Sequence, residues 1–181
     1  MSRGFTKEDD AQTPPIIPPR AALPAGTPNY VTPAGLELLR AELATLEVAR
    51  TRAEADHSND TDRTHRLSFY NGRLALLLER LGSARVVDPA GQPPREVRFG
   101  ATVTLRTVSG GTQGSASAKP GFERRFTIVG VDEADISLGK VAFVAPISRA
   151  VLGAKLKKQV SLQLGTPAEV VEVTAIHYSG S

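Results

Sequence analysis

The clearest hydrophobic pattern lies between residues 36 and 81, where apolar side chains recur at spacings of three and four. This spacing places them on one face of a helix and is typical of the seam of a coiled coil. A polar stretch, residues 56–62 (DHSNDTD), divides the pattern into two series. The first series is Leu36, Leu39, Leu43 and Leu46, and the second is Leu67, Tyr70, Leu74, Leu77 and Leu81.

The two series match each other when the chain is folded back between Ser58 and Asn59. Thr32 followed by Pro33 is typical of the N-cap and the first position of a helix. The pattern therefore predicts an antiparallel coiled-coil hairpin over residues 30–84, and the helical rise places its tip about 35 to 40 Å from its base. The predicted pairs are Leu46 with Tyr70, Leu43 with Leu74, Leu39 with Leu77, and Leu36 with Leu81.

Three residues of the second predicted helix do not fit a simple two-helix seam. Leu76 and Leu78 fall outside it, so we expect another part of the chain or a partner to pack against the lower hairpin. Gly72 lies inside the helix, where glycine costs about 1 kcal/mol relative to alanine. We interpret Gly72 as a point of close approach between the two helices.

Beyond residue 84 the pattern changes to short β-branched runs bounded by Gly, Pro and Asp, which is typical of strands. Residues 147–152 predict one short helix that stops at Gly153. Residues 110–121 predict a flexible loop within a hairpin. The fold class is therefore α+β, with the helical hairpin followed by a small curled sheet or half-open barrel. The expected strands lie in residues 97–108, 124–131, 140–146, 159–164 and 169–178.

The first 29 residues are rich in proline, which favours extended polyproline II structure. We predict a disordered tail here. The alternative is a docking peptide with Ile16 and Ile17 as its anchors. The predicted organisation is a tail over residues 1–29, the hairpin over 30–84, a linker over 85–95 and a C-terminal domain over 96–181.

Composition narrows the functional classes. The absence of cysteine excludes disulfides, thiolate catalysis and cysteine-based metal sites. The chain has no apolar run of about 20 residues and no secretory signal, so we expect a cytoplasmic protein without membrane contact. The net charge of +3 favours approach to nucleic acid or to an acidic surface. Aromatic residues make up only 5%, which argues against a base-stacking platform.

The DHSNDTD stretch carries the candidate chemistry. Its carboxylates, Asp56, Asp60 and Asp62, have two interpretations of similar weight. Ser, Asn and Asp are the usual residues of a helix-to-helix turn, so the stretch can be purely structural. Alternatively, the carboxylates form a functional acidic tip. A third and weaker possibility is a metal site formed by His57, Asp60, Asp62 and His65, whose loop spacing matches no known ligand pattern.

Several segments, in order along the chain, resemble the bacterial GreA/GreB transcript-cleavage factors. They cover about residues 30 to 178, and they include the opening helix, the closing helix with its linker, and three signatures of an FKBP-like C-terminal domain. The matching segments are residues 30–36 (YVTPAGL), 39–43 (LRAEL), 69–74 (FYNGRL), 80–81 (RL), 84–88 (ARVVD), 99–103 (FGATV), 128–135 (IVGVDEAD) and 145–153 (APISRAVLG).

This resemblance implies an accessory factor of bacterial RNA polymerase that has no catalytic site and no cofactor of its own. Because the helical seam is paired within the chain, a monomer is the simplest expectation. Gre factors place the FKBP-like domain at the rim of the polymerase secondary channel and pass the coiled coil into it. Acidic tip residues then help to hold a second Mg²⁺ beside the polymerase carboxylates, so that backtracked RNA is cleaved. Carboxylates suit this role because hard cations about 4 Å apart need oxygen ligands. Nascent RNA and DNA would be met only within the elongation complex.

The same resemblance suggests where polymerase contacts lie in the C-terminal domain. The expected contact residues belong to two of the family signatures, although acidic residues 132–135 also suit a charged turn between strands. A basic cluster follows the short helix and is either a solvated face or a contact with polymerase or nucleic acid. The expected contacts are Asp132, Glu133, Pro146, Ile147 and Arg149, and the basic cluster is Lys155, Lys157 and Lys158.

The tip departs from the family pattern. Gre factors carry an acidic D-x-x-E-N motif, whereas here Asp62 is followed at that spacing by His65. The arms also align as about one heptad shorter, which is about 10 Å of helix. We therefore expect an elongation factor that modulates backtracked or paused complexes, with a non-cleaving regulator of the channel as the main alternative. Two weaker alternatives are a coiled-coil adaptor that uses Leu76 and Leu78, and a prolyl isomerase. The isomerase would need an aromatic pocket, and the domain's aromatic residues are Phe99, Phe122, Phe126, Phe143 and Tyr178.

Overall fold

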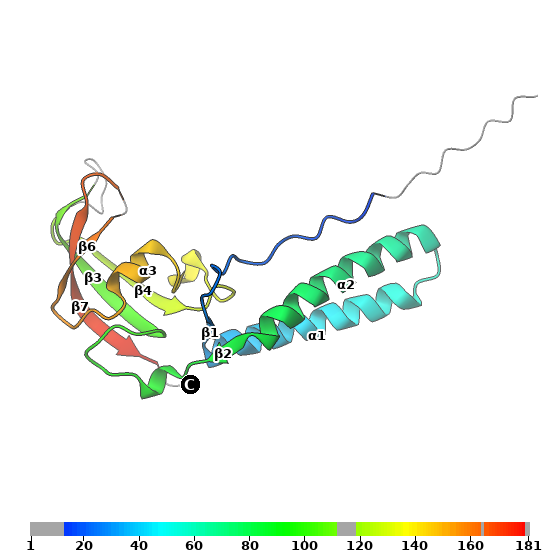
Figure 1. Cartoon of the computed structure of the whole chain (residues 1–181), viewed down its shortest axis with the longest axis horizontal. Coiled ribbons are helices and arrows are strands. Elements are labelled where there is room, and N and C mark those ends of the chain that lie inside the picture. Colours follow the sequence, from blue (N-terminus) through cyan, green and yellow to red (C-terminus); the bar gives the residue numbers. More distant parts are fainter. Residues whose placement is uncertain (1–12, 112–118, 164, 180–181) are drawn as a thin grey trace, which may run out of the picture.

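The structure is a computed structural model that describes residues 13–111, 119–163 and 165–179. A long two-helix hairpin projects from one side of a β domain, so the molecule is elongated (Figure 1). The chain enters through an extended N-terminal segment, forms the hairpin and then builds the β domain with its one short α-helix. The predicted α+β architecture is thus confirmed.

The hairpin consists of α1 (Pro33–Ala55) and α2 (Asp60–Gly82). Each helix has 23 residues, which corresponds to a length of about 35 Å. The helices end on either side of Ser58 and Asn59, so the predicted fold-back point is confirmed. All eight residues of the four predicted pairs belong to one apolar cluster. Its buried members are Val31, Leu39, Leu46, Leu74 and Leu77, and Leu36, Leu43, Tyr70 and Leu81 pack against them.

Two short strands join the base of the hairpin. Strand β1 (Asn29–Val31) precedes α1 and pairs in parallel with β2 (Ala84–Val86), which follows α2. The side-chain amide of Asn29 donates to the carbonyl of Arg80 at 2.9 Å and to Oγ of Ser83 at 3.2 Å. Both ends of the hairpin are therefore fastened together where they enter the β domain.

The interpretation of Gly72 as a contact between the helices is wrong. The atoms nearest to a Cβ at Gly72 all belong to Ile17, and Cδ1 of Ile17 would lie only 1.9 Å away. The glycine therefore makes room for the N-terminal segment. Residues 13–28 of this segment are extended and follow the hairpin to its junction with the β domain (Figure 1). Residues 1–12 of the predicted tail lie outside the described residues.

The β domain is a five-stranded sheet with the order β5-β4-β3-β7-β6. The β4–β5 pair is parallel and the other pairs are antiparallel. Register shifts on β3, after Thr104 and after Thr107, interrupt its pairing with β7, and such irregularities bend a sheet. The strands are β3 (Ala101–Gly110), β4 (Glu123–Val129), β5 (Lys140–Ala142), β6 (Gln159–Leu162) and β7 (Glu169–Tyr178).

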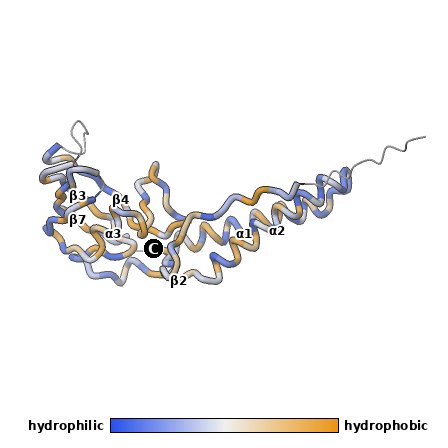
Figure 2. Tube along the Cα trace, turned by 45° about the horizontal axis from the view of Figure 1, so that its top comes forward, coloured by the Kyte–Doolittle hydropathy of each residue, from blue (hydrophilic) through white to orange (hydrophobic). Residues whose placement is uncertain are grey.

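Helix α3 (Pro146–Val151) packs on the core of the domain, to which it contributes the buried Val151. Short 3₁₀ turns occur at Pro89–Gly91 and Ile136–Leu138. Hydrophobic and hydrophilic positions are mixed along the β domain, whereas the hairpin tip is mainly hydrophilic (Figure 2). The predicted loop over residues 110–121 does connect two paired strands, but residues 112–118 lie outside the described part. The buried core residues include Val97, Val103, Leu105, Ile128, Val151, Leu162, Val171 and Val173.

Candidate functional site

The hairpin tip is a turn built by side chains. Helix α1 ends at Ala55, and Oδ1 of Asp56 accepts hydrogen bonds from the backbone N–H of Ser58 at 3.1 Å and from its hydroxyl at 2.6 Å. Asn59 is the N-cap of α2, and its Oδ1 accepts from the N–H groups of Thr61 and Asp62. Such capping bonds satisfy backbone donors that a helix start leaves unpaired. The turn is therefore held by hydrogen bonds among its own residues.

Two of the three tip carboxylates have an arginine partner. Oδ2 of Asp56 lies 2.6 Å from Nη2 of Arg66, and Oδ1 of Asp60 lies 3.1 Å from Nη2 of Arg63. The Ser58 hydroxyl and then Arg66 hold the pKa of Asp56 well below its usual value. The Asp62 carboxylate has no hydrogen bond or ion pair within the described residues. Asp62 is thus the tip carboxylate with neither a hydrogen bond nor an ion pair among the described residues, although its charge also interacts with that of Arg66.

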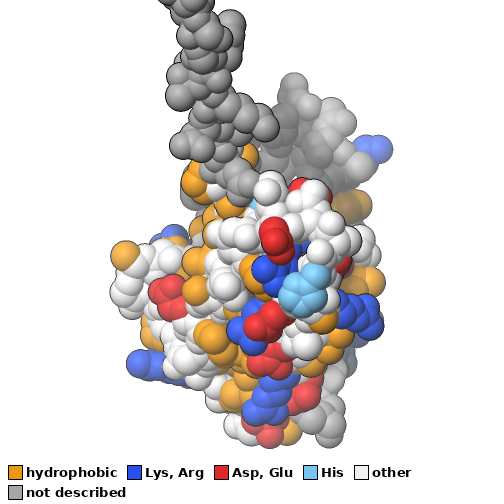
Figure 3. Space-filling model, turned by 90° about the vertical axis from the view of Figure 1, so that its right-hand side faces the viewer, with side chains coloured by type: hydrophobic (Ala, Val, Ile, Leu, Met, Phe, Trp, Pro, Cys, Tyr) orange, Lys and Arg blue, Asp and Glu red, His pale blue; other side chains and the backbone are white. Residues whose placement is uncertain are grey.

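The proposed histidine-containing metal site is not formed. Nδ1 of His57 lies 2.9 Å from Nη1 of Arg63, a cation that would repel a metal ion. No three of the candidate residues gather into a group that could hold a metal, and no such group occurs elsewhere in the described residues. Acidic, basic and histidine side chains instead lie interspersed at the hairpin end of the molecule (Figure 3).

The helix start gives a structural reason for acidic residues at the tip. Asp60 and Asp62 both lie in the first turn of α2. A negative charge there interacts favourably with the helix dipole, by about 0.3 to 1 kcal/mol for an exposed group. The structural and the functional interpretations of these residues are therefore compatible, because Asp62 can support the helix while its oxygens stay exposed.

A second polar cluster lies at the junction of the hairpin and the β domain. Oε2 of Glu133 accepts a 2.5 Å hydrogen bond from the Thr32 hydroxyl, and Oε1 accepts from Nζ of Lys140 at 3.0 Å. The same Thr32 oxygen caps α1 by accepting from the N–H of Gly35. A Cβ at Gly35 would lie 2.7 Å from the Glu133 carboxylate, so this close contact requires glycine. The β domain thereby takes part in capping the first helix of the hairpin.

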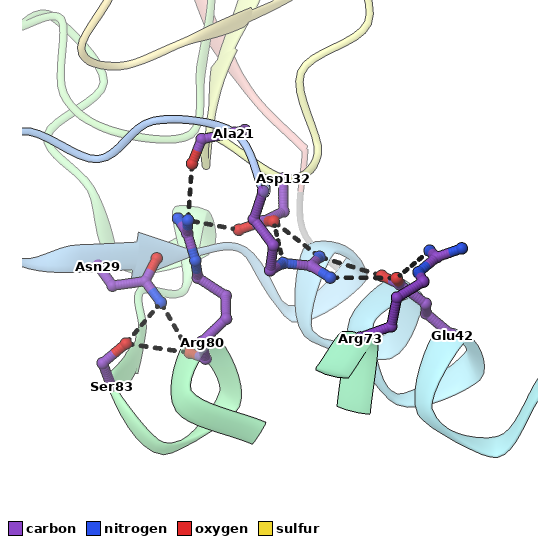
Figure 4. Close-up of polar contacts among 8 residues, drawn as sticks. Ala21, Asn29, Glu42, Arg73, Arg80, Ser83 and Asp132 are labelled. Atoms are coloured by element: carbon purple, nitrogen blue, oxygen red, sulfur yellow. Dashed lines mark hydrogen bonds and ion pairs between the residues drawn. The ribbon is translucent and has the colours of Figure 1, made fainter. Parts of the chain in front are cut away.

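Asp132, the neighbour of Glu133, is surrounded by arginines (Figure 4). Its Oδ1 lies 2.8 Å from Nη2 of Arg20, and its Oδ2 lies 3.2 Å from Nη1 of Arg80. The carboxylate of Glu42 on α1 binds the other side of the Arg20 guanidinium and also pairs with Arg73. The hydrogen bond from Arg20 lowers the pKa of Glu42. The junction is therefore a chain of alternating charges that crosses from the β domain to both helices.

Comparison with known proteins identifies the family. A model described as the C-terminal part of the transcription elongation factors GreA/GreB matches residues 92–178. The transcription elongation factor GreA of Trichlorobacter lovleyi is 35% identical over 135 residues, which cover 73% of this chain and 79% of that protein. The chain belongs to the GreA/GreB family of transcription elongation factors.

Further relatives and solved structures are similar over most of the chain. The GreA of Ralstonia nicotianae is 32% identical over 163 residues, which cover 82% of this chain and 96% of that protein. A GreA/GreB factor from Nitrosomonas europaea is 23% identical and covers 82% of this chain and 98% of its own, with a TM-score of 0.37. The GreA factor homolog 1 of Thermus thermophilus is 18% identical, and the match covers 83% of this chain and 99% of that chain, with a TM-score of 0.36.

The predicted contact residues of this GreA/GreB family member fall into two groups. Asp132 and Glu133 lie in the buried junction, where their carboxylates are already bonded within the chain. Pro146 and Arg149 are exposed on α3, whereas Ile147 is half-buried and packs against the core of the β domain. The second group is therefore open to a partner, and the first group lies between the hairpin and the β domain.

The remaining exposed residues that could contact a partner lie elsewhere on the β domain of this Gre factor. The basic cluster of Lys155, Lys157 and Lys158 is exposed, as predicted from its polarity. Ile136 and Leu138 are 78% and 70% exposed on the 3₁₀ turn between β4 and β5, and the sequence analysis missed them. The available signal was an apolar pair within a turn capped by Asp135 and ended by the left-handed Gly139.

Three aromatic residues of this Gre factor pack together where the hairpin base meets the β domain. The ring of Tyr30, from strand β1, lies 5.8 Å from that of Phe99 and 5.7 Å from that of Phe143. Phe99 and Phe143 also contact each other at 5.7 Å and are buried. The aromatic space that an isomerase would offer to a proline is thus filled by the hairpin base.

No helix of the described residues is long and apolar enough to cross a membrane.

Proposed function

We propose that this chain acts on backtracked or paused transcription elongation complexes by binding bacterial RNA polymerase, in the cytoplasm, at the secondary channel. Family membership supports polymerase as the partner. The observation that carries the proposal is the shape of the hairpin, which is only two helices thick, about 35 Å long and polar at its tip. A narrow rod of this kind suits entry into a channel, and its apolar seam keeps it straight without a third helix.

The exposed side chains of the β domain would dock on the rim of the channel. Ile136 and Leu138 offer apolar surface that gains free energy when covered, at about 25 cal/mol per Å². Arg149 and the basic cluster of Lys155, Lys157 and Lys158 would attract an acidic surface and speed the encounter. In this proposal Asp132 and Glu133 contribute to binding by holding the hairpin in place, since their carboxylates are bonded inside the chain.

At the tip, the chain itself supplies one free carboxylate, Asp62. It cannot hold a metal ion unaided, because the described residues contain no group of three suitable ligands. Beside a Mg²⁺ held by polymerase carboxylates, Asp62 would add one oxygen ligand to a partial site. Mg²⁺ would supply the Lewis acidity for hydrolysis of the RNA, and the chain would supply position and charge.

A second candidate function is supported by the ion pairs of the tip. Arg63 and Arg66 offset the charges of Asp60 and Asp56, so the tip carries less free negative charge than three carboxylates would give. A tip of this kind would occupy the channel and regulate the polymerase without promoting cleavage. The two candidates share the same binding mode and differ only in the role of Asp62.

Photo-crosslinking of the full-length chain to the cognate elongation complex tests the shared binding mode. A photoreactive residue would replace Glu54, which is exposed in the last turn of α1. A matched probe would replace Glu123 on β4, which is exposed in the β domain. We expect the probe at position 54 to crosslink to residues that line the channel near the active site, and the probe at 123 to crosslink only outside it. Crosslinks from position 54 to the outer surface alone would refute channel entry.

A further inference from the structure

The N-terminal segment has a regular contact face. Ile17, Arg20 and Leu23 are half-buried, and the residues between them are exposed. A repeat of three residues is the period of a polyproline II helix, in which every third side chain lies on one face. The prolines of this stretch favour that conformation, so one face of residues 17–23 is turned toward the folded protein. We call residues 17–23 the strap.

The two ends of the strap make apolar contacts with different parts of the molecule. Ile17 packs on α2 at Gly72, whose missing Cβ leaves the space for its side chain. Leu23 packs against the core of the β domain. The strap also lies beside Leu76, one of the two leucines outside the helical seam. It therefore covers apolar surface on the hairpin and on the β domain at once.

Arg20, in the middle of the strap, makes charged contacts with both the hairpin and the β domain. Arg20 donates to both oxygens of Glu42 on α1, at 3.1 and 3.0 Å, and to Oδ1 of Asp132 in the β domain, at 3.0 and 2.8 Å. Arg80 on α2 donates to the carbonyl of Ala21 at 2.6 Å. A guanidinium holds several acceptors in a fixed plane, so the geometry at Arg20 is more specific than that of a lysine pair.

We propose that the strap ties the hairpin to the β domain and fixes the angle between them. It contacts α1, α2 and the β domain, whereas the β1–β2 pair is only three residues long. Because prolines restrict the unfolded segment, docking the strap costs less conformational entropy than docking an ordinary tail. In a factor that acts through its tip, a small change of this angle moves the far end of a 35 Å hairpin by many ångströms.

Disulfide trapping tests whether the strap is docked in solution. The chain has no cysteine, so no native thiol competes with a pair of introduced cysteines, and working at low protein concentration keeps oxidation within one molecule. A Cβ at position 72 would lie 2.9 Å from Cγ1 of Ile17, which places the β-carbons of Ile17→Cys and Gly72→Cys near the separation that a disulfide needs. The matched control is Ile16→Cys with Gly72→Cys, because Ile16 is 88% exposed.

We expect the 17/72 pair to oxidise at least about tenfold faster than the 16/72 pair, because docking raises the effective concentration of only one pair. Equal rates for the two pairs would show that the strap is not held in this register and would overturn the proposal.

A distance measurement in the full-length chain tests the effect on the angle. Spin labels on Glu54→Cys and Glu123→Cys report the separation between the hairpin tip and the β domain. Arg20→Glu reverses the charge between Glu42 and Asp132. The control Arg40→Glu changes an exposed arginine whose one ion pair among the described residues is with Glu37 on the same helix. We expect a broader distribution of distances for Arg20→Glu and an unchanged one for Arg40→Glu. Equal distributions for both variants and the parent would refute the proposed tie, because Arg20 would then not hold the angle.

Discussion

The base and the tip of the hairpin use the same kinds of charged residue in opposite environments. At the base, Asp132 lies between Arg20 and Arg80, and its side chain is only 9% exposed. At the tip, Asp60 lies beside Arg63, and its side chain is 81% exposed. A buried charge that loses its partner destabilises a protein strongly, whereas an exposed ion pair contributes little.

Under the proposed function, this difference separates carboxylates that hold the structure together from carboxylates that would act in the polymerase. The junction residues cannot change without loosening the hairpin from the β domain, so their first role is to hold the two parts together. We expect the tip residues to contribute little to the stability of the fold. Their two ion pairs are exposed, and the leucine seam already specifies the hairpin. In the proposed function the tip can therefore serve a partner, and Asp62, which is exposed and has no ion pair within the described residues, is the carboxylate proposed for that role.

A junction carboxylate should contribute much more to the free energy of unfolding than a tip carboxylate. Asp132→Ala leaves two largely buried arginines short of a partner, and we expect it to lower the free energy of unfolding by about 3 kcal/mol. Asp60→Ala removes an exposed pair and one favourable helix-dipole charge, and we expect a loss below about 1 kcal/mol. Urea unfolding followed by circular dichroism measures both, and losses of similar size would contradict the distinction.

The pH dependence of stability tests the ion pair of Glu42, the residue that links the junction to α1. Its pKa is lowered in the folded chain by the hydrogen bond from Arg20. A lowered folded pKa means that the contribution of the pair is present above the ordinary value of 4.5 and is lost as the pH falls through the folded pKa.

We therefore expect wild type to be more stable than Glu42→Gln by about 1 kcal/mol at pH 7, and this difference to close under acid. The control Glu37→Gln removes an exposed pair within α1 and should show a smaller difference at pH 7. Urea unfolding at a series of pH values measures the effect. A stability difference for Glu42→Gln that does not change with pH would contradict the proposed pairing.

Much of the fold follows from local patterns in the sequence. Leu39 and Leu77 lie far apart along the chain, but the spacing of their neighbours and a single polar turn were enough to pair them, because one fold-back point satisfies all four predicted pairs. Alternating β-branched runs likewise predicted the strands of the sheet. The contact partner of Gly72 was predicted wrongly. A glycine inside a helix indicates that another segment approaches closely, but it does not show which segment that is.

The candidate site was harder to predict because its decisive contacts are long-range. Arg20 lies 112 residues from Asp132 in the sequence, and nothing near either residue indicates the pair. The proline content of the N-terminal segment favoured disorder, and only the fold shows that its three-residue repeat matches a surface. At the tip the sequence predicted three candidate carboxylates, but the ion pairs that distinguish Asp62 from Asp56 and Asp60 depend on the orientation of side chains around the turn.

The most direct test of the central claim is the rate of RNA cleavage in backtracked elongation complexes of the cognate polymerase, measured with wild type, Asp62→Asn and the control Glu54→Gln at matched polymerase occupancy. If the free carboxylate of the tip acts in the polymerase, wild type and Glu54→Gln accelerate cleavage and Asp62→Asn loses at least about tenfold of that acceleration. Acceleration that persists in Asp62→Asn, or a rate that wild type leaves unchanged or lowers, would contradict the claim; the second result would favour a regulator that only occupies the channel.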